Sequence, residues 1–185
     1  MDNKITLVIG GCRSGKSGHA LCLANQITGN RKIFMATSVP TDNEMEDRVT
    51  KHQKERGGQW ITCEVPVDIP SRIAQISRSA DVILVDCLTL WVSNLMFNDF
   101  DEDRISKMVE ELQNALADAD SPVFLVSNEV GAGIVPENAL ARKFRDMAGM
   151  VNQKIAQTAD RVIYMVAGIP MTIKQEIPVS TKPVF

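Results

Sequence analysis

Short apolar runs recur along this 185-residue chain, and the stretches between most of them are compatible with helices. The runs occupy residues 5–9, 32–36, 60–64, 82–86, 122–127 and 161–167. Residues 82–85 and 123–126 are apolar throughout, as in central strands that are buried on both faces. Strands that alternate with helices predict a mostly parallel sheet covered by helices, which is an α/β fold.

Apolar residues at three-to-four spacing mark the inner faces of two helices. One face carries Ile105, Met108, Val109, Leu112 and Leu116, and the other carries Leu140, Phe144, Met147, Val151 and Ile155. Near the end, the sequence Gly168-Ile169-Pro170 predicts a turn, after which residues 171–174 return as a short antiparallel edge strand. We therefore expect one domain over residues 1–174, followed by a loosely ordered tail over residues 175–185.

Charge and composition indicate which kinds of binding partner and which compartment to expect. The net charge is −3 and the basic residues are scattered, so neither a nucleic acid nor an anionic membrane is predicted as a partner. No apolar run approaches the roughly 20 residues that a membrane span requires. The four cysteines form no CxxC pair, and the first residues do not read as a secretion signal, so we expect a reduced, cytoplasmic protein.

The most informative motif is GGCRSGKS, which lies between the first apolar run and a helix-compatible stretch. This strand–loop–helix context predicts a phosphate-binding loop, in which backbone N–H groups and a helix N-terminus surround a polyphosphate. We expect Lys16 to act in catalysis by reaching the β- and γ-phosphates, and the Ser17 hydroxyl to ligate Mg²⁺. The nucleotide-binding residues of the loop are Gly10, Gly11, Cys12, Arg13, Ser14, Gly15, Lys16 and Ser17. Cys12 is either an ordinary loop residue or a reactive thiol.

Two further segments should border the same site. Asp86 ends an apolar strand, which is where proteins with a phosphate loop place an acidic residue near magnesium, so Asp86 is a second metal-site candidate. Ala36, Thr37 and Ser38 follow another strand, and ligands collect beyond the carboxyl ends of parallel strands. Thr37 and Ser38 are positioned either to donate hydrogen bonds to a ligand or to cap a helix.

The chain has two histidines, His19 and His52. His52 falls on the same predicted helix stripe as Met45 and Val49, which favours a structural role against the sheet. The chemical alternative is nucleophilic catalysis, because a neutral imidazole can attack phosphorus and then leave when a second acceptor arrives. His19 is expected to be structural or partly exposed.

These motifs, taken together, resemble the bifunctional adenosylcobinamide kinase and adenosylcobinamide-phosphate guanylyltransferase family of cobalamin biosynthesis. The resemblance runs from the phosphate loop through residues 36–38, 44–45, 48–52 and 128–131. Its most distinctive part is Gly133-Ile134-Val135-Pro136-Glu137-Asn138, followed by Arg142, Phe144-Arg145-Asp146 and Asn152-Gln153. It covers residues 4–174 in all.

The resemblance implies a RecA-like sheet, a homotrimer and two reactions. In the first, ATP or GTP phosphorylates adenosylcobinamide. In the second, GTP transfers GMP to adenosylcobinamide phosphate through a guanylyl intermediate on His52, with release of pyrophosphate. It also implies that Gln53, Lys54, Glu55, Arg56, Glu64 and Asp86 contact the guanine nucleotide, together with the phosphate loop and residues 36–38.

Two other functions remain open from the residues alone. One is a kinase of another small molecule, which transfers only the γ-phosphoryl group. The other is a nucleotide-hydrolysing switch module. The sequence does not rank ATP against GTP for the kinase step, and it does not identify the residues that contact the corrinoid. For Arg142 and Arg145, which share a helix face, the alternatives are phosphate or subunit contacts and plain exposure to solvent.

Overall fold

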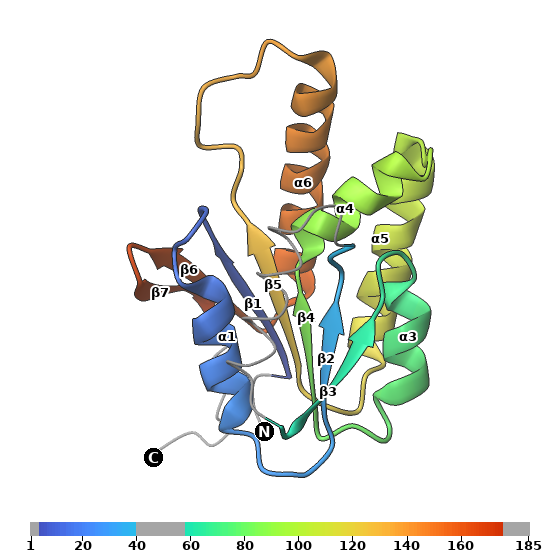
Figure 1. Cartoon of the computed structure of the whole chain (residues 1–185), viewed down its shortest axis with the longest axis vertical. Helices are drawn as coiled ribbons and strands as arrows, with labels where there is room; N and C mark the ends of the chain where they lie inside the picture. The colour runs from blue at the N-terminus through green and yellow to red at the C-terminus, as the bar shows by residue number, and fades with distance from the viewer. Residues whose placement is uncertain (1–3, 40–57, 176–185) are drawn as a thin grey trace, which may run out of the picture.

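The computed structural model describes residues 4–39 and 58–175 and contains one seven-stranded sheet (Figure 1). The strands are β1 (Ile5–Gly10), β2 (Lys32–Ala36), β3 (Trp60–Glu64), β4 (Val82–Asp86), β5 (Val123–Asn128), β6 (Arg161–Val166) and β7 (Ile169–Gln175). Their order is β3-β2-β4-β5-β1-β6-β7. All neighbouring strands are parallel except β6 and β7, which pair antiparallel. The predicted α/β class with an antiparallel edge is confirmed.

Helices cover both faces of the sheet and give the molecule three layers (Figure 1). The helices are α1 (Lys16–Asn25), α3 (Ile69–Ile76), α4 (Leu88–Phe97), α5 (Glu102–Ala117) and α6 (Ala139–Thr158). One apolar cluster joins Ala20 and Ala24 of α1 to side chains such as Val8 and Leu84 on one sheet face. A larger cluster joins the other four helices to the opposite face. The sheet is therefore buried on both sides, which explains its continuous apolar strands.

Side chains at the start of three helices accept hydrogen bonds from backbone N–H groups of the first turn. The carboxylate of Asp68 accepts from the N–H of Ser71, and that of Asp101 accepts from the N–H of Arg104. Asn138 caps α6 in the same way through the N–H of Ala141. Each cap satisfies an N–H group that has no partner inside its own helix. The sequence therefore sets where α3, α5 and α6 begin.

Most predicted elements match the structure, and the differences lie at the sheet edge and at one helix start. The predicted turn at Gly168-Ile169-Pro170 is wrong: Val166 pairs with Ile169, so the turn consists of Ala167 and Gly168. Both turn residues have positive φ, which is the requirement of a two-residue type I′ hairpin. Strand β7 consequently begins two residues earlier than expected and continues to Gln175. Leu140, expected on the inner face of α6, is 59% exposed because the first turn of α6 extends beyond the sheet (Figure 1).

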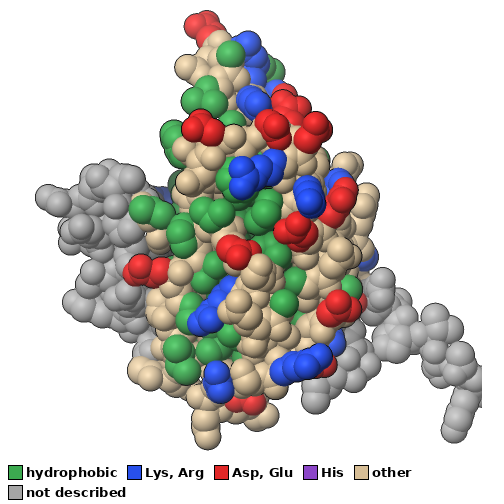
Figure 2. All heavy atoms as spheres, turned by 90° about the vertical axis from the view of Figure 1, so that its right-hand side faces the viewer, with side chains coloured by type: hydrophobic (Ala, Val, Ile, Leu, Met, Phe, Trp, Pro, Cys, Tyr) green, Lys and Arg blue, Asp and Glu red, His purple; other side chains and the backbone are tan. Residues whose placement is uncertain are grey.

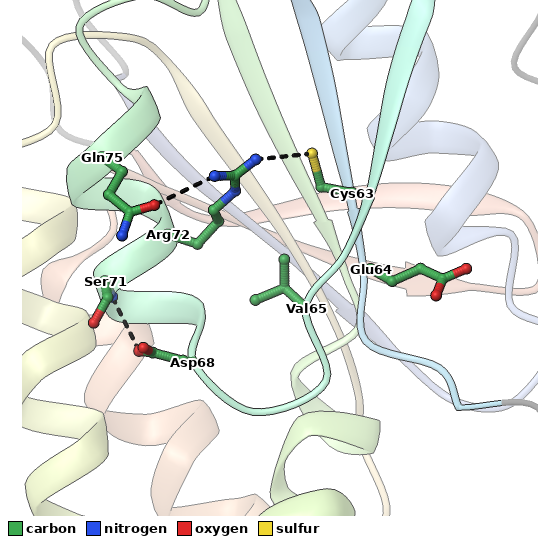
Figure 3. A pocket seen from close by; sticks show the side chains of 7 residues that line it. All are labelled: Cys63, Glu64, Val65, Asp68, Ser71, Arg72 and Gln75. Carbon is green, nitrogen blue, oxygen red and sulfur yellow. Dashed lines mark hydrogen bonds between the residues drawn. The ribbon is translucent and has the colours of Figure 1, made fainter.

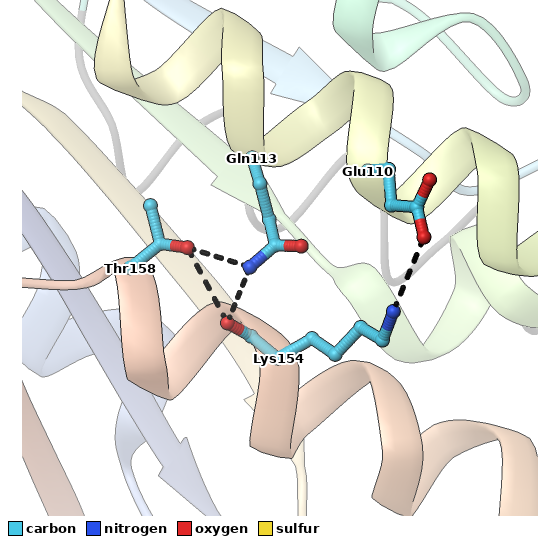
Figure 4. A network of polar contacts seen from close by, with 4 residues as sticks. All are labelled: Glu110, Gln113, Lys154 and Thr158. Atoms are coloured by element: carbon cyan, nitrogen blue, oxygen red, sulfur yellow. Dashed lines mark hydrogen bonds and ion pairs between the residues drawn. The ribbon is translucent and has the colours of Figure 1, made fainter.

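The surface that carries α3 and α5 shows basic and acidic side chains intermixed (Figure 2). Ion pairs in this part of the molecule include an exposed one between Arg78 and Asp120 and a partly exposed one between Lys154 and Glu110. A network between α5 and α6 joins Gln113 of α5 to Lys154 and Thr158 of α6 (Figure 4). In the part of the chain that the structure describes, no helix has the length and apolar character needed to cross a bilayer.

Candidate functional site

The phosphate loop, residues 10–17, connects the end of β1 to the start of α1 as the motif predicts. Gly15 stands immediately before the helix with φ +89°, a left-handed conformation that a side chain would disfavour. The loop folds back on itself through a 3.3 Å hydrogen bond from the Ser14 N–H to the Gly11 carbonyl. The N-terminus of α1 therefore opens toward the loop, which is the arrangement that binds phosphate in this class of site.

Close packing fixes the floor of the loop. A Cβ atom at Gly10 would lie 2.6 Å from the Ser14 hydroxyl oxygen and 2.7 Å from the Met165 carbonyl oxygen, so only glycine fits there. The Ser14 hydroxyl is buried and has no hydrogen-bond partner among the described residues. A buried hydroxyl without a partner is costly unless something else supplies one. A phosphate oxygen has the chemistry to accept its hydrogen.

Lys16 lies within the loop rather than in solvent. It is 9% exposed, and its ammonium group donates to the Gly11 carbonyl oxygen at 3.0 Å. Its neighbour Ser17 is half-buried in the first turn of α1, whereas Cys12 and Arg13 are exposed. The hydrogen bond to Gly11 therefore keeps the positive charge of Lys16 inside the loop.

Three predicted residues stand in one row across the carboxyl edge of the sheet. Ala36 of β2 pairs with Glu64 of β3 on one side and with Asp86 of β4 on the other. Residues paired in register share a sheet face, and this face is the one that α1 covers. Two strand spacings separate the backbones of Glu64 and Asp86, or about 10 Å. The fold thus brings Glu64 and Asp86 to the same face and the same edge as the phosphate loop.

Figure 3 shows the side chains around β3, where a pocket of about 400 Å³ lies between this strand and α3. Arg72 projects into it, with its guanidinium 3.5 Å from the Cys63 sulfur and 3.3 Å from the Gln75 side-chain oxygen. Glu64 also lines the pocket, but its side chain extends to the other side of the strand (Figure 3). The alternation of side chains along β3 therefore assigns Cys63 to the α3 side and Glu64 to the α1 side.

The structure assigns the Thr37 hydroxyl to neither of the two roles that the sequence suggested, donation to a ligand or capping of a helix. It is completely buried, and its hydroxyl accepts from the Cys87 N–H at 2.7 Å and donates to the Cys87 carbonyl at 2.8 Å. Its own N–H donates to the Asp86 carbonyl. The hydroxyl is therefore engaged with the backbone of the neighbouring strand end and is not available to donate to a ligand. Ser38, the next residue, is half-exposed.

Cys87 reports how close the phosphate loop lies to the end of β4. Burial, and then the negative charge of Asp86, raise the pKa of the Cys87 thiol to about 11, while hydrogen bonds and the positive charge of Lys16 act in the opposite direction. Opposite charges from the loop and from the end of β4 therefore converge on one buried side chain.

Sequence reasoning missed the polar side chains that hold this edge together. The Thr89 hydroxyl accepts from the Asn128 N–H at 2.6 Å, and the Asn152 amide donates to the Asn128 carbonyl at 3.0 Å. Asn94 of α4 makes two comparable bonds to loop carbonyls. Of these side chains, only Asn152 falls in a segment that the sequence resemblance includes. Isolated Thr and Asn residues within helices give no periodic signal, so local patterns assign no role to any of them.

Several predicted site residues fall outside the described part of the chain: His52, Gln53, Lys54, Glu55 and Arg56. His19 is partly exposed, in agreement with the sequence, and burial followed by the charge of Arg161 lowers its pKa below the ordinary value. The Arg142 guanidinium donates to the carbonyls of Pro136 and Glu137, so it fastens the preceding loop to α6. Arg145 is half-buried, and its guanidinium nitrogen lies 3.7 Å from the Asp146 carboxylate.

A parallel sheet with a phosphate loop after β1 and an acidic residue at the end of β4 defines a P-loop nucleotide-binding protein. The flagellar accessory protein FlaH from Methanocaldococcus jannaschii has a similar fold, with a TM-score of 0.53 and 14% identity, covering 95% of this chain and 80% of that chain. At this identity the likeness concerns the fold alone.

Residues 6–173 match the model of the cobinamide kinase / cobinamide phosphate guanyltransferase family, and the chain belongs to that family. The bifunctional adenosylcobalamin biosynthesis protein CobU of Salmonella typhimurium is 41% identical over 180 residues, covering 91% of this chain and 98% of the relative. The corresponding protein CobP of Pseudomonas aeruginosa is 39% identical over 170 residues, covering 92% and 97%. The predicted family is therefore confirmed, and the chain is a transferase.

Proposed function

We propose that this chain carries out both reactions of its family on one nucleotide site. In the kinase reaction, the aminopropanol hydroxyl of adenosylcobinamide attacks the γ-phosphorus of ATP or GTP, and the nucleoside diphosphate leaves. In the second reaction, GTP supplies GMP to adenosylcobinamide phosphate. The observation that carries the proposal is the buried Lys16 side chain, whose ammonium group donates to the Gly11 carbonyl inside the phosphate loop, because a lysine held in such a loop supports binding of a triphosphate.

The guanylyl transfer divides into two displacements. A nitrogen of His52 attacks the α-phosphorus of GTP, a P–N bond forms, and the bond to the leaving pyrophosphate breaks. A phosphate oxygen of adenosylcobinamide phosphate then attacks the same phosphorus, and the P–N bond breaks. The products are adenosylcobinamide-GDP and the regenerated, free imidazole. Family membership supports the overall reaction, and the assignment to His52 rests on the sequence resemblance.

The residues at the carboxyl edge have separate tasks in this proposal. The backbone of residues 10–15 and the Lys16 ammonium hold the phosphates, and Glu64 and residues 36–38 border the nucleotide. Ser17 and Asp86 supply hydroxyl and carboxylate oxygens, the hard donors that Mg²⁺ prefers, so they would hold the metal. Bound Mg²⁺ neutralises charge on the phosphate oxygens. Gln53, Lys54, Glu55 and Arg56 are assigned to the nucleotide by resemblance.

Labelling with α-³²P GTP tests the covalent step. We expect acid-labile, alkali-stable label on the wild-type protein, no label on His52→Ala, and full label on His19→Ala, which removes the other histidine. A chase with adenosylcobinamide phosphate should move the label to the product. Label that persists on His52→Ala contradicts the assignment. Transfer of γ-label alone indicates a simple kinase, and hydrolysis without an acceptor indicates a switch module.

We also propose a cytoplasmic homotrimer. All four cysteines are free thiols, which agrees with a reducing compartment. Strand β7 exposes the apolar side chains of Ile169, Met171 and Ile173, and a surface of this kind suits contact between subunits. Light scattering coupled to size exclusion measures the mass, and cell fractionation tests the compartment. A monomeric mass at micromolar concentration contradicts the trimer.

A further inference from the structure

The side chain of Asn94 in α4 joins the two segments that follow the neighbouring strands β2 and β3. Its amide nitrogen donates to the Thr37 carbonyl at 2.7 Å and to the Pro66 carbonyl at 2.9 Å. Thr37 follows β2 directly, and Pro66 lies two residues beyond the end of β3. An amide nitrogen carries two hydrogens, so both of its donors are used. Figure 1 shows α4 beside the carboxyl ends of these strands.

The two tethered segments are also fixed by other contacts. Thr37 is held at every polar group, because Asp86 accepts its N–H, Cys87 binds its hydroxyl and Asn94 donates to its carbonyl. The segment after β3 is bonded back to β2 by the Val65 N–H, which donates to the Ala36 carbonyl at 2.8 Å. One turn earlier on α4, Trp91 donates its indole N–H to the Val67 carbonyl at 2.6 Å. Helix α4 thus presents two donor side chains, Trp91 and Asn94, to the segments that follow β2 and β3.

The positions fixed in this way belong to the proposed nucleotide site. Ala36 and Ser38 flank Thr37, and Glu64 precedes the segment that Asn94 and Trp91 hold. Losing the amide leaves two carbonyls without their donor, and the two backbones relax independently. The nucleotide then has to order both segments on binding, and that ordering costs affinity.

We propose that Asn94 is a positioning residue for the nucleotide, acting through the backbones of Thr37 and Pro66 without touching the substrate. This inference rests on the proposed function, since it takes residues 36–38 and Glu64 as the border of the site. A positioning role predicts an effect on nucleotide affinity that exceeds the effect on folding. A purely structural role predicts an effect on folding alone.

The chain offers a matched control in Gln113. Its amide nitrogen also donates to two acceptors, the Lys154 carbonyl at 3.0 Å and the Thr158 hydroxyl at 2.8 Å (Figure 4). This network lies near the start of β6, at the amino ends of the parallel strands, whereas the phosphate loop follows the carboxyl end of β1. Asn94→Ala and Gln113→Ala therefore each remove one amide and two hydrogen bonds, but only the former affects the candidate site.

The experiment measures KM and kcat of the kinase reaction, the Kd of the β,γ-imido analogue of GTP with magnesium, and the urea midpoint of unfolding. We expect both variants to lower the midpoint, while Asn94→Ala alone raises KM and Kd by about tenfold, with kcat within about twofold of the wild type. Asn94→His, which retains one ring N–H donor, should give an intermediate Kd and provides the test if the alanine variant does not fold.

Unchanged KM and Kd in Asn94→Ala or Asn94→His would overturn the proposal, as would an equal rise in Gln113→Ala. Binding of the imido analogue involves no covalent step. A wild-type chain that binds the analogue but carries no label on His52 therefore counts against the guanylyl-histidine mechanism alone. A variant at Asn94 that binds as tightly as the wild type counts against the positioning role alone.

Discussion

The N–H of Gly168 donates a hydrogen bond to the carbonyl oxygen of Ser14 at 3.1 Å. The tight turn between β6 and β7 thus supports the phosphate loop from the side, although more than 150 residues separate the two in the sequence. A Cβ atom at Gly15 would also lie 3.5 Å from the Gly168 Cα atom, in ordinary contact. The hairpin turn and the phosphate loop therefore form one packed unit.

Substitutions in that turn should change stability in opposite directions. Ala167 has φ +51°, a conformation that alanine disfavours and asparagine tolerates, so Ala167→Asn should stabilise the protein by about 0.5–1 kcal/mol. Gly168 has φ +82°, and a Cβ atom added there would stand in open space, so Gly168→Ala should cost about 1–2 kcal/mol through backbone strain alone. Urea unfolding measures both. A stabilising Gly168→Ala variant contradicts the assigned turn.

The apolar pattern predicts the sheet because a helix-covered strand has to be apolar on both faces. Runs such as residues 82–85 and 123–126 are typical of strands buried on both faces, and they form the centre of the sheet. The β6–β7 turn could not be placed in the same way. Gly168 and Pro170 both signal a turn, and only the pairing of Val166 with Ile169 shows that Pro170 belongs to a strand.

The candidate site is predicted where a local motif encodes it. The phosphate loop is contiguous, so its position between β1 and α1 follows from the sequence. The row of Glu64, Ala36 and Asp86 depends on strand order, which local patterns do not specify. The engagement of the Thr37 hydroxyl with Cys87 depends on contacts across 50 residues. No spacing rule contains that information.

Gly10→Ala should impair the phosphate loop for a steric reason. The added methyl group would meet the Ser14 oxygen at 2.6 Å and the Met165 carbonyl oxygen at 2.7 Å, and the second atom belongs to the backbone of β6. We expect the Kd for the imido GTP analogue to rise by about tenfold or more, because displaced loop N–H groups no longer converge on the phosphates. Calorimetric titration measures the Kd.

Gly149→Ala is the control for that substitution. Gly149 lies within α6, and a Cβ atom there would meet nothing within 4 Å. Alanine is the better helix former, so this variant should be more stable by about 0.5–1 kcal/mol and should bind the analogue as the wild type does. Equal affinity of Gly10→Ala and the wild type would contradict the tight packing of the loop.

Cys87 should make stability fall with alkaline pH. Its folded-state pKa is about 11, above the ordinary value of 9.0, because burial and the Asp86 charge oppose the thiolate. Between these values the unfolded chain loses the proton and the folded chain keeps it, so the free energy of unfolding decreases by up to about 2–3 kcal/mol. Below pH 9 the contribution is constant.

Comparison with Cys87→Ala isolates this effect from other groups that titrate in the same range. Urea unfolding from pH 8 to pH 11 should show a steeper decline for the wild type than for the variant. Parallel declines for the two proteins would mean that the thiol ionises as easily in the folded state as in the unfolded chain.

Lys16 and Lys32 permit a direct separation of catalysis from folding. Both lysines are buried, and both donate to a backbone carbonyl, Lys16 to Gly11 at 3.0 Å and Lys32 to Asn25 at 3.1 Å. Methionine keeps the length and the apolar stem of each side chain and removes the charge.

Lys16→Met should therefore lower kcat/KM for both reactions by about a hundredfold or more, since the charge that stabilises the phosphates is lost. Lys32→Met should affect unfolding only, because its ammonium group lies at the far end of α1, against Asn25. Steady-state kinetics, with the urea midpoint measured in parallel, distinguish the two. A Lys16→Met enzyme with wild-type kcat/KM would remove the phosphate-holding role from this lysine.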